Sequence, residues 1–416
     1  MRTSTRGAFW AERFLIVVMA ACCFFRYGVL HADFSLKAKA AFAAVDESAW
    51  TWDVLVIPPE KGWENAAGES IRRTLAWHQT RISESGDGIH GHDLQFVLLP
   101  PTSEDMEGAA KNYVLPVASH TVAVLSFASY PLDRELIKHA ARTGVPLLLA
   151  GGENVFLYER GRLSPFVFAL DLFQDYRCRA FADYATKTLE KKYRLSVMGA
   201  RFTLNEEREA KICFDLLSEA GFIPMPYWLD ASVTDTFTLV EQEIKAAGDG
   251  VLLCYVGGMA SKEIWRGVMR NSSPCRLWYG GAPDASFRSF KGMVFADQNM
   301  YLDERGGFEQ LKRDLWMSRT VSISDKVAAG RANALALWLI QALGAIPGQN
   351  LEKPHPKELI SKLESAAGIP FGAQVLDIDA TTHRPRQRKV HILEVRDRNF
   401  TVLDTLDVKG LPYYDY

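Results

Sequence analysis

The fold class is decided by residues 122–149, which read VAVLSFASYPLDRELIKHAARTGVPLLL. The stretch begins with an apolar run at 122–125 and ends with a second one at 146–149. Between them, residues 132–142 have apolar side chains at helical spacing, and Gly144 ends the pattern. Short strands that are apolar throughout are typical of a sheet buried on both faces, so a helix between two of them predicts a parallel crossover.

The same alternation extends in both directions from this unit. Upstream, a strand at 53–57 leads into a helix in which Ile71, Leu75, His78 and Ile82 recur at helical spacing. We therefore expect an α/β protein with two doubly wound, Rossmann-like lobes. The other predicted elements are strands at 94–99, 195–198, 251–255, 276–279, 375–378, 390–395 and 400–403, and helices at 175–191, 206–219, 325–343 and 356–367.

The composition is that of a packed globular protein. The 416 residues are 48% hydrophobic and 24% charged, and their number exceeds that of one ordinary domain. Basic and acidic residues number 48 and 50, which leaves a formal charge of -2. Because affinity for nucleic acid comes largely from neutralising phosphates, this balance argues against a nucleic-acid partner.

The first residues have the arrangement of an export signal. Arginines at positions 2, 6 and 13 lead into an apolar run at 14–25, which is shorter than a spanning helix needs. We expect residues 1–32 to be a signal peptide cleaved after Ala32, and residues 33–50 to be a polar segment of the periplasmic protein. Cleavage before Cys22 would instead give a lipoprotein anchored through that cysteine, and this alternative stays open.

Four cysteines follow this segment, and none belongs to a C-x-x-C pair, so the sequence offers no zinc ribbon or thioredoxin-like site. An oxidising compartment permits disulfides without requiring them. Cys178 and Cys213 lie on consecutive predicted helices and could pair, but buried thiols explain them equally well. The sequence leaves the state of these two, and of Cys254 and Cys275, open.

Several segments, in order along the chain, carry a resemblance to a known family. They are GIHGHDL at 88–94, the strand, serine-bearing turn, helix, Gly-Val-Pro and strand of 122–153, DTF at 235–237, IKAAG at 244–248, and Gly372, Asp377, Asp379 and HRP at 383–385. From about residue 52 to about residue 406, the chain resembles type I periplasmic binding proteins of the leucine/isoleucine/valine-binding kind. The order of the segments is more specific than any one of them.

The resemblance implies a two-lobed clamp of the periplasmic-binding-protein type I kind. Each lobe would hold its own sheet, and the chain would cross between the lobes through a three-strand hinge, near Phe168, Phe295 and Ala373. A ligand would bind at the carboxyl ends of the strands, in the cleft between the lobes. The expected boundaries are 51–168 plus 296–372 for lobe 1 and 169–295 plus 373–416 for lobe 2.

The resemblance also implies a function. We expect an extracytoplasmic solute-binding protein of an ABC importer, a monomer that captures a small polar ligand, such as an amino acid or a related compound, and delivers it to an inner-membrane permease. Such a carrier has no catalytic residues and needs no cofactor. A sensory or regulatory binding protein of the same fold is the first alternative. An exported α/β enzyme is less favoured, because no G-x-G-x-x-G follows a predicted strand and neither a P-loop nor a G-x-S-x-G motif occurs.

Two loops of the first lobe carry candidate ligand-binding residues. Ser129 falls on the serine with which this family holds a ligand carboxylate, and the start of the following helix can receive an anion. The same serine would also serve as a plain helix cap. After the next strand, where the family often has a small residue and a threonine, this chain has Gly151, Gly152 and Glu153. If Gly151 and Glu153 line the cleft, the glutamate suits a cationic or hydroxyl-rich ligand, and a solvated loop glutamate is the alternative.

Two further candidates complete the expected site. Asp284 lies near the family's acidic partner for a ligand ammonium, and a turn-forming aspartate is the alternative. Trp63 stands near the family's aromatic platform, whose own position holds Ala67 here, although packing on its own loop would explain the tryptophan equally well. Leu204 and Gly257 replace aromatic residues of the family, so the amino-acid pattern is incomplete.

His90, His92 and Asp93 could be read as a metal cluster, because alternate positions that enter a strand share one face. Their fit to the glycine turn of the family favours two surface histidines instead. We therefore expect no metal site in this protein.

Overall fold

The computed structural model describes segments of the chain from Thr51 onward. The predicted signal peptide, the polar segment and Cys22 lie outside the described residues. Those residues are 51–59, 62–101, 115–128, 132–151, 158–159, 162–170, 173–190, 194–200, 204–229, 236–255, 275–280, 285–297, 325–347, 353–371 and 374–409. Within these ranges, every helix is too short or too polar to cross a membrane.

The first sheet has five strands, and every neighbouring pair is parallel. Its order is β2-β1-β3-β4-β7, so the chain moves outward in opposite directions from β1 and β3. Such a reversal of strand order opens a crevice at the carboxyl ends of the two central strands. The strands are β1 (Thr51–Ile57), β2 (Asp93–Leu98), β3 (Thr121–Ser126), β4 (Leu147–Leu149) and β7 (Val167–Ala169).

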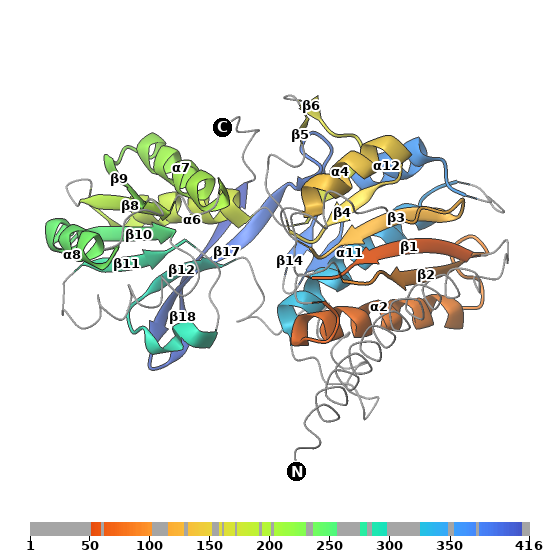
Figure 1. Cartoon of the computed structure of the whole chain (residues 1–416), viewed down its shortest axis with the longest axis horizontal. Helices are drawn as coiled ribbons and strands as arrows, with labels where there is room; N and C mark the ends of the chain where they lie inside the picture. Colours follow the sequence, from red (N-terminus) through yellow and green to blue (C-terminus); the bar gives the residue numbers. More distant parts are fainter. Residues whose placement is uncertain are drawn as a thin grey trace, which may run out of the picture. The chain divides into compact units, whose positions relative to one another are not determined.

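Helices cover both faces of this sheet, which explains why its central strands are buried along almost their whole length and mostly apolar. Alternate residues of β1 divide between the faces. Val54 and Val56 pack in one cluster with α2 and α11, whereas Leu55 and Ile57 pack in another with α4. Figure 1 shows α2 and α4 on opposite faces of the sheet. The helices of this half are α2 (Ala66–Glu84), α4 (Leu132–Thr143), α11 (Lys326–Gly344) and α12 (Pro356–Glu364).

The second sheet repeats the arrangement and extends it. Its order is β18-β17-β12-β11-β10-β8-β9, in which the five strands from β12 to β9 are parallel and follow the order of the first sheet. β17 pairs with β12 in antiparallel fashion, and β18 pairs with β17 in the same way. The strands are β8 (Leu195–Ala200), β9 (Pro224–Leu229), β10 (Val251–Tyr255), β11 (Arg276–Tyr279), β12 (Val294–Asp297), β17 (Gln387–Arg396) and β18 (Asn399–Lys409).

The helices of the second half are α6 (Phe173–Thr188), α7 (Leu204–Glu219) and α8 (Thr236–Ala247), with a 3-10 turn, η1 (Ala285–Ser289). Phe181 of α6 stacks on Trp278 of β11, at 5.2 Å between ring centroids, and fixes this helix to the sheet. Ile244 of α8 packs on the opposite face, in a cluster with Leu252 and Phe295. The predicted α/β class with two doubly wound sheets is therefore confirmed.

Several elements differ from the sequence-based expectation, and β7, β12 and α8 are among those that were not predicted. β9 was not predicted, because Pro224 and Pro226 are rare in strands; the structure accommodates them because, among the described strands, β9 pairs only with β8. The helix expected to reach residue 367 ends at Glu364, where the Ser365 amide and hydroxyl bond the carbonyls of the last turn. The apolar run at 400–403 is part of a strand of 11 residues, whose later residues alternate between polar and apolar.

The cysteine question left open by the sequence is answered by the structure. Cys178 of α6 and Cys213 of α7 form a disulfide, with 4.7 Å between their Cα atoms and both side chains fully buried. The bond ties the two helices that cover one face of the second sheet. Cys254 and Cys275 remain as buried thiols.

We predict that replacing both bridged cysteines, Cys178 and Cys213, with alanine lowers the free energy of unfolding by about 3 to 4 kcal/mol, because the bond closes a loop of 35 residues in the unfolded chain. Urea unfolding of the variant measures the loss. The matched control replaces Cys254 and Cys275 with alanine, which removes two buried sulfurs and no cross-link. Equal losses in the two variants would show that the cross-link contributes nothing.

A second prediction concerns the free energy of unfolding at acidic pH. His78 of α2 is 4% exposed and its Nε2 lies 2.8 Å from Asn333 Oδ1 of α11, and burial lowers the pKa of His78 to about 4. Because this pKa lies below the unfolded value of 6.5, the neutral imidazole stabilises the fold fully above pH 6.5. We expect a loss approaching about 3 kcal/mol as the pH falls from 6.5 through 4.

The paired variant H78L/N333L removes the titrating group together with its partner. Its free energy of unfolding should fall less over the same pH range, measured by urea unfolding at each pH. An acid loss as large as that of the unaltered protein would assign the effect to other groups.

Candidate functional site

The loops that follow β1, β3 and β4 leave from the same edge of the first sheet, because these strands are parallel. The loops carry Trp63, Ser129, and Gly151 with Glu153, in that order. Gly151 is half-buried at the bend after β4, and Ala150 donates its amide to the Ser126 carbonyl at 2.8 Å. Ser129 and Glu153 lie outside the described residues, so their part in a site stays a prediction.

The loop after β3 is fixed at both ends by a buried pair that sequence reasoning missed. Ser126, the last residue of β3, donates its hydroxyl to Asp133 Oδ1 at 2.7 Å, and both residues are 1% exposed. The same hydroxyl oxygen accepts the Ala128 amide at 3.3 Å. Asp133 also lies in the first turn of α4, where a carboxylate is favoured by the helix dipole. A serine at the end of a strand, followed by an aspartate in the first turn of the next helix, is the signal in the sequence.

The loop after β1 is held by Trp63 and Asn65. The indole N–H of Trp63 donates to the Leu99 carbonyl at 2.7 Å. Its ring is partly exposed and packs against the apolar cluster that contains Val54 and Val56. Asn65 caps α2, since its Oδ1 accepts the amides of Ala67 and Gly68 and its Nδ2 donates to the Gly62 carbonyl. Trp63 is thus bonded to the segment after β2 and not only to its own loop, and contact of its partly exposed ring with a ligand stays a prediction.

Gly68 lets this loop lie against the first turn of α2. A Cβ at this position would stand 2.3 Å from the Gly62 carbonyl oxygen and 2.7 Å from the Trp63 Cα. Because both atoms belong to the backbone, the loop and not a flexible side chain would have to move. The position of Trp63 thus depends on a residue that the sequence analysis did not single out.

In the second half of the chain, the carboxyl ends of β8, β10 and β11 form the corresponding edge. Gly199 is tightly packed there, since a Cβ would meet Trp228 and Ala210 at under 3 Å. Gly280 follows β11 and donates its amide to the Cys254 carbonyl at 2.9 Å. Leu204 begins α7, while Asp284 and Gly257 lie outside the described residues.

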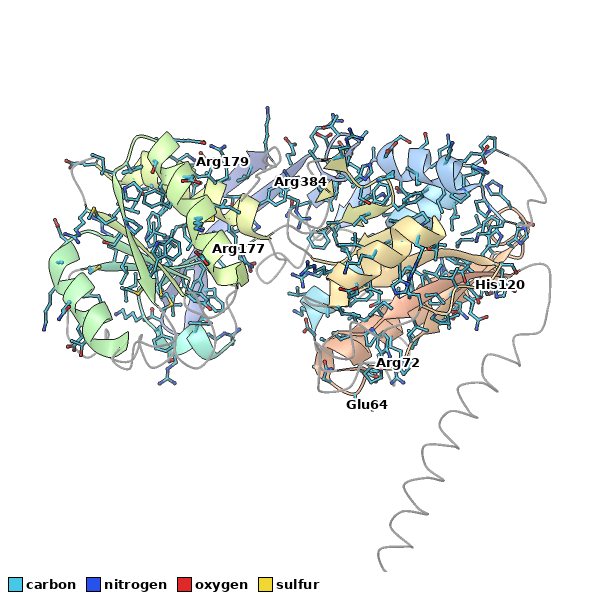
Figure 2. All side chains as sticks on the ribbon, turned by 45° about the horizontal axis from the view of Figure 1, so that its top comes forward. Glu64, Arg72, His120, Arg177, Arg179 and Arg384 are labelled. Atoms are coloured by element: carbon cyan, nitrogen blue, oxygen red, sulfur yellow. A yellow bond between two sulfur atoms is a disulfide. The ribbon has the colours of Figure 1, made fainter. Side chains whose placement is uncertain are left out.

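A titratable pair at the other end of the first sheet is separate from these loops. His120 Nε2 lies 2.9 Å from Asp53 Oδ2, and Asp53 stands beside Thr121, where β3 begins. Burial raises the pKa of Asp53, while the imidazole beside it acts in the opposite direction. His120 is labelled in Figure 2. The pair lies near the amino ends of the strands, away from the edge at which ligands bind in such sheets.

The three residues considered for a metal have separate partners. His90 Nε2 lies 3.1 Å from the Leu343 carbonyl oxygen, Asp93 accepts the Ser83 hydroxyl, and His92 stacks on Trp52 with 4.4 Å between ring centroids. His92 is 2% exposed, so the expectation of a surface histidine is wrong for it, because Trp52 draws the ring into the core. In the described part of the chain, no group of three such side chains could hold a metal ion.

Comparison with known proteins gives structural relatives only. No family model matches the sequence, and no curated protein matches it. Among solved structures, the leucine-binding protein LivK of Thermotoga maritima is 12% identical, with a TM-score of 0.66 over 85% of this chain and 98% of that one. The chain has the fold of the type I periplasmic binding proteins.

Other solved structures with this fold were determined with aromatic acids bound. An ABC transporter solute-binding protein of R. palustris in complex with benzoate is 14% identical, with a TM-score of 0.64 over 86% of this chain and 98% of that one. A second, in complex with 4-hydroxybenzoate, is also 14% identical, with a TM-score of 0.65 over 87% and 98%. At this identity the likeness concerns the fold, and these ligands are properties of those proteins.

We predict that G68A displaces the loop that carries Trp63 and lowers the free energy of unfolding by about 1 to 3 kcal/mol, because the added methyl group overlaps backbone atoms. Thermal unfolding measures the loss, and near-ultraviolet circular dichroism reports on the tryptophan. The control is G344A at the end of α11, where a Cβ would meet nothing within 4 Å. A loss no greater than that of the control would contradict the role given to Gly68.

Proposed function

We propose that this protein is the extracytoplasmic solute-binding protein of an ABC importer. The observation that carries the proposal is the repeated strand order, which gives both sheets the same reversal between their two central strands. In such sheets the crevice at the carboxyl ends binds ligands, and two of them in one chain suit a clamp. The fold match to LivK over 98% of that chain supports the same function. The importer's permease in the inner membrane would be the partner.

We propose lobe boundaries at 51–168 plus 296–372 and at 169–295 plus 373–416, with three crossings between the lobes. A small polar ligand would bind in the cleft between them. Its receptors would be Ser129 for a carboxylate and Asp284 for an ammonium, with Glu153 and Gly151 beside them and the exposed part of the Trp63 ring as an apolar wall. An amino acid or a related compound meets the demands of Ser129 and Asp284, because it carries both charges on one small skeleton. If Glu153 also faces the cleft, a cationic or hydroxyl-rich ligand suits the site better, because two carboxylates repel.

The proposed carrier works outside the cytoplasm and performs no catalysis. Residues 1–32 would direct export and be removed, which leaves a periplasmic protein, and acylation at Cys22 is the alternative form. The Cys178–Cys213 bond supports this compartment, since disulfides form and persist where the environment is oxidising.

We expect at least one ligand in a panel of amino acids, amides, polyamines and aromatic acids to raise the melting temperature of the purified protein. A ligand at about 100 times its dissociation constant adds roughly 2.7 kcal/mol to the free energy of unfolding. The panel also shows whether the protein binds amino acids or aromatic acids, such as those bound in two of the related structures. No shift with any compound would argue against solute capture.

Variants of the two receptor positions extend this experiment. S129A and D284A should each weaken the ligand by about tenfold or more, because each removes a hydrogen bond to a charged group. The matched controls are S218A and D249A, at exposed positions of the second half. Unchanged ligand affinity in both receptor variants would overturn the assigned binding site but would not contradict the proposed carrier function.

A further inference from the structure

One glutamine side chain joins a short hairpin to the second sheet. The hairpin consists of β13 (Ile369–Phe371) and β14 (Gln374–Leu376), which pair in antiparallel fashion, and β14 is labelled in Figure 1. Gln374 Oε1 accepts the Lys389 amide of β17 at 2.8 Å, and Gln374 Nε2 donates to the Lys389 carbonyl at 3.2 Å. A single side chain therefore bonds both backbone groups of one strand residue.

The glutamine takes the place of a strand residue at this edge of β17. A side-chain amide has a carbonyl oxygen and N–H donors, so it can exchange two bonds with a backbone as an antiparallel partner does. On one edge of β17, Lys389 lies opposite Asp407 of β18. On the other edge, the pairing with β12 ends at Asp297, opposite His391. Gln374 therefore continues the ladder on the β12 edge, two residues beyond the last pair.

The Gln374 side chain is buried, and this makes its two bonds interdependent. Gln374 is 8% exposed, and burying an amide without hydrogen bonds costs free energy. The Lys389 backbone supplies both an acceptor and a donor. If the amide moved away, the Lys389 N–H and carbonyl would lose these bonds at the same time. We therefore expect the two bonds to open and close together.

The hairpin itself is packed in the first half of the chain. Ile369, Phe371 and Leu376 are at most 1% exposed and belong to the apolar cluster of α2 and α11. β17, in contrast, is a strand of the second sheet. The bonds of Gln374 thus join an element that packs on helices of the first half to a strand of the second half.

A neighbouring arginine fastens the same place. Arg388 is 1% exposed, and its guanidinium lies over the Phe371 ring of the hairpin, 4.3 Å from the centroid. Its Nη1 donates to the Leu170 carbonyl at 3.1 Å. Leu170 follows β7, the last strand of the first sheet before the chain continues into α6. Arg388 and Lys389 are therefore bonded to the hairpin and to the segment that leaves the first sheet.

We propose that Gln374 is a clasp that limits how far the two halves of the chain move relative to each other. While both bonds are closed, the hairpin and the beginning of β17 move as one body. A larger movement of one sheet relative to the other has to open the clasp, because its two sides are packed in different halves. The strength of two neutral hydrogen bonds at one residue then sets the stiffness of the junction.

Hydrogen exchange of the Lys389 amide tests the clasp without any ligand, so its outcome is independent of the proposed function. Q374M keeps a long side chain that fills the site and removes both bonds. We expect the Lys389 amide to exchange about tenfold faster in this variant, because its local opening no longer breaks a hydrogen bond. The Val251 amide, which donates to the Arg194 carbonyl in the second sheet, should keep its rate. Unchanged exchange at Lys389 would overturn the proposal.

The movement itself is measured by electron–electron double resonance between two spin labels. The labels are attached through E84C at the end of α2 and S218C in α7, two exposed positions in different halves of the chain. We expect a broader distribution of distances in Q374M than in the protein with Gln374, because an open clasp permits more conformations of the junction.

Two further variants separate the clasp from a general loss of stability. Q387A removes an exposed glutamine of the same strand and should leave both the Lys389 exchange and the distance distribution unchanged. Q374N keeps the amide but is one methylene too short to reach both Lys389 groups, so it should act like Q374M, and it replaces that variant if Q374M does not fold. Equal broadening in Q387A would overturn the proposal, and so would fast exchange at Lys389 without any broadening.

Discussion

Burial of both faces of two parallel sheets is the constraint on which the rest of this structure depends. A central strand such as β1 sends alternate side chains of its later residues into two different apolar clusters, which leaves little place for polar groups there. They gather instead at the ends of the strands and in the loops beyond them. The Ser126–Asp133 pair lies at the carboxyl end of a strand, and the Asp53–His120 pair lies near the amino ends.

The direction of the strands then determines which kind of group can bind at each end of the sheet. At the carboxyl ends, loops such as the one after β1 lead into helices whose first amides need partners, and Asn65 supplies them for α2. The same amides can receive a ligand where no side chain caps them. At the amino ends the chain arrives from helix carboxyl termini, which favour cations over anions. A receptor for a small charged solute is therefore expected at the first edge.

Much of the fold could be predicted from the sequence, because its signals are local. Apolar runs located the central strands to within two residues, and Asp325 was read as the start of a helix that it caps in the structure. β9 was not predicted because its prolines argue against a central strand, and the local sequence does not show whether a strand lies at the edge of a sheet. The pairing of Cys178 with Cys213 depended on how two helices pack, which their sequences alone do not state. The candidate ligand residues came from resemblance, and most of them lie outside the described part of the chain.

Long-range polar contacts are what sequence reasoning could not supply. His78 and His383 are both buried histidines, and each is held by partners far away in the sequence. Burial lowers the pKa of His78 to about 4, while the hydrogen bond to Asn333 acts in the opposite direction. The two ring nitrogens of His383 lie 3.0 Å from the Val167 carbonyl oxygen and 2.9 Å from Glu364 Oε1. Asn333 lies 255 residues from His78, and Val167 lies 216 residues from His383, so neither contact leaves a signal in the local sequence.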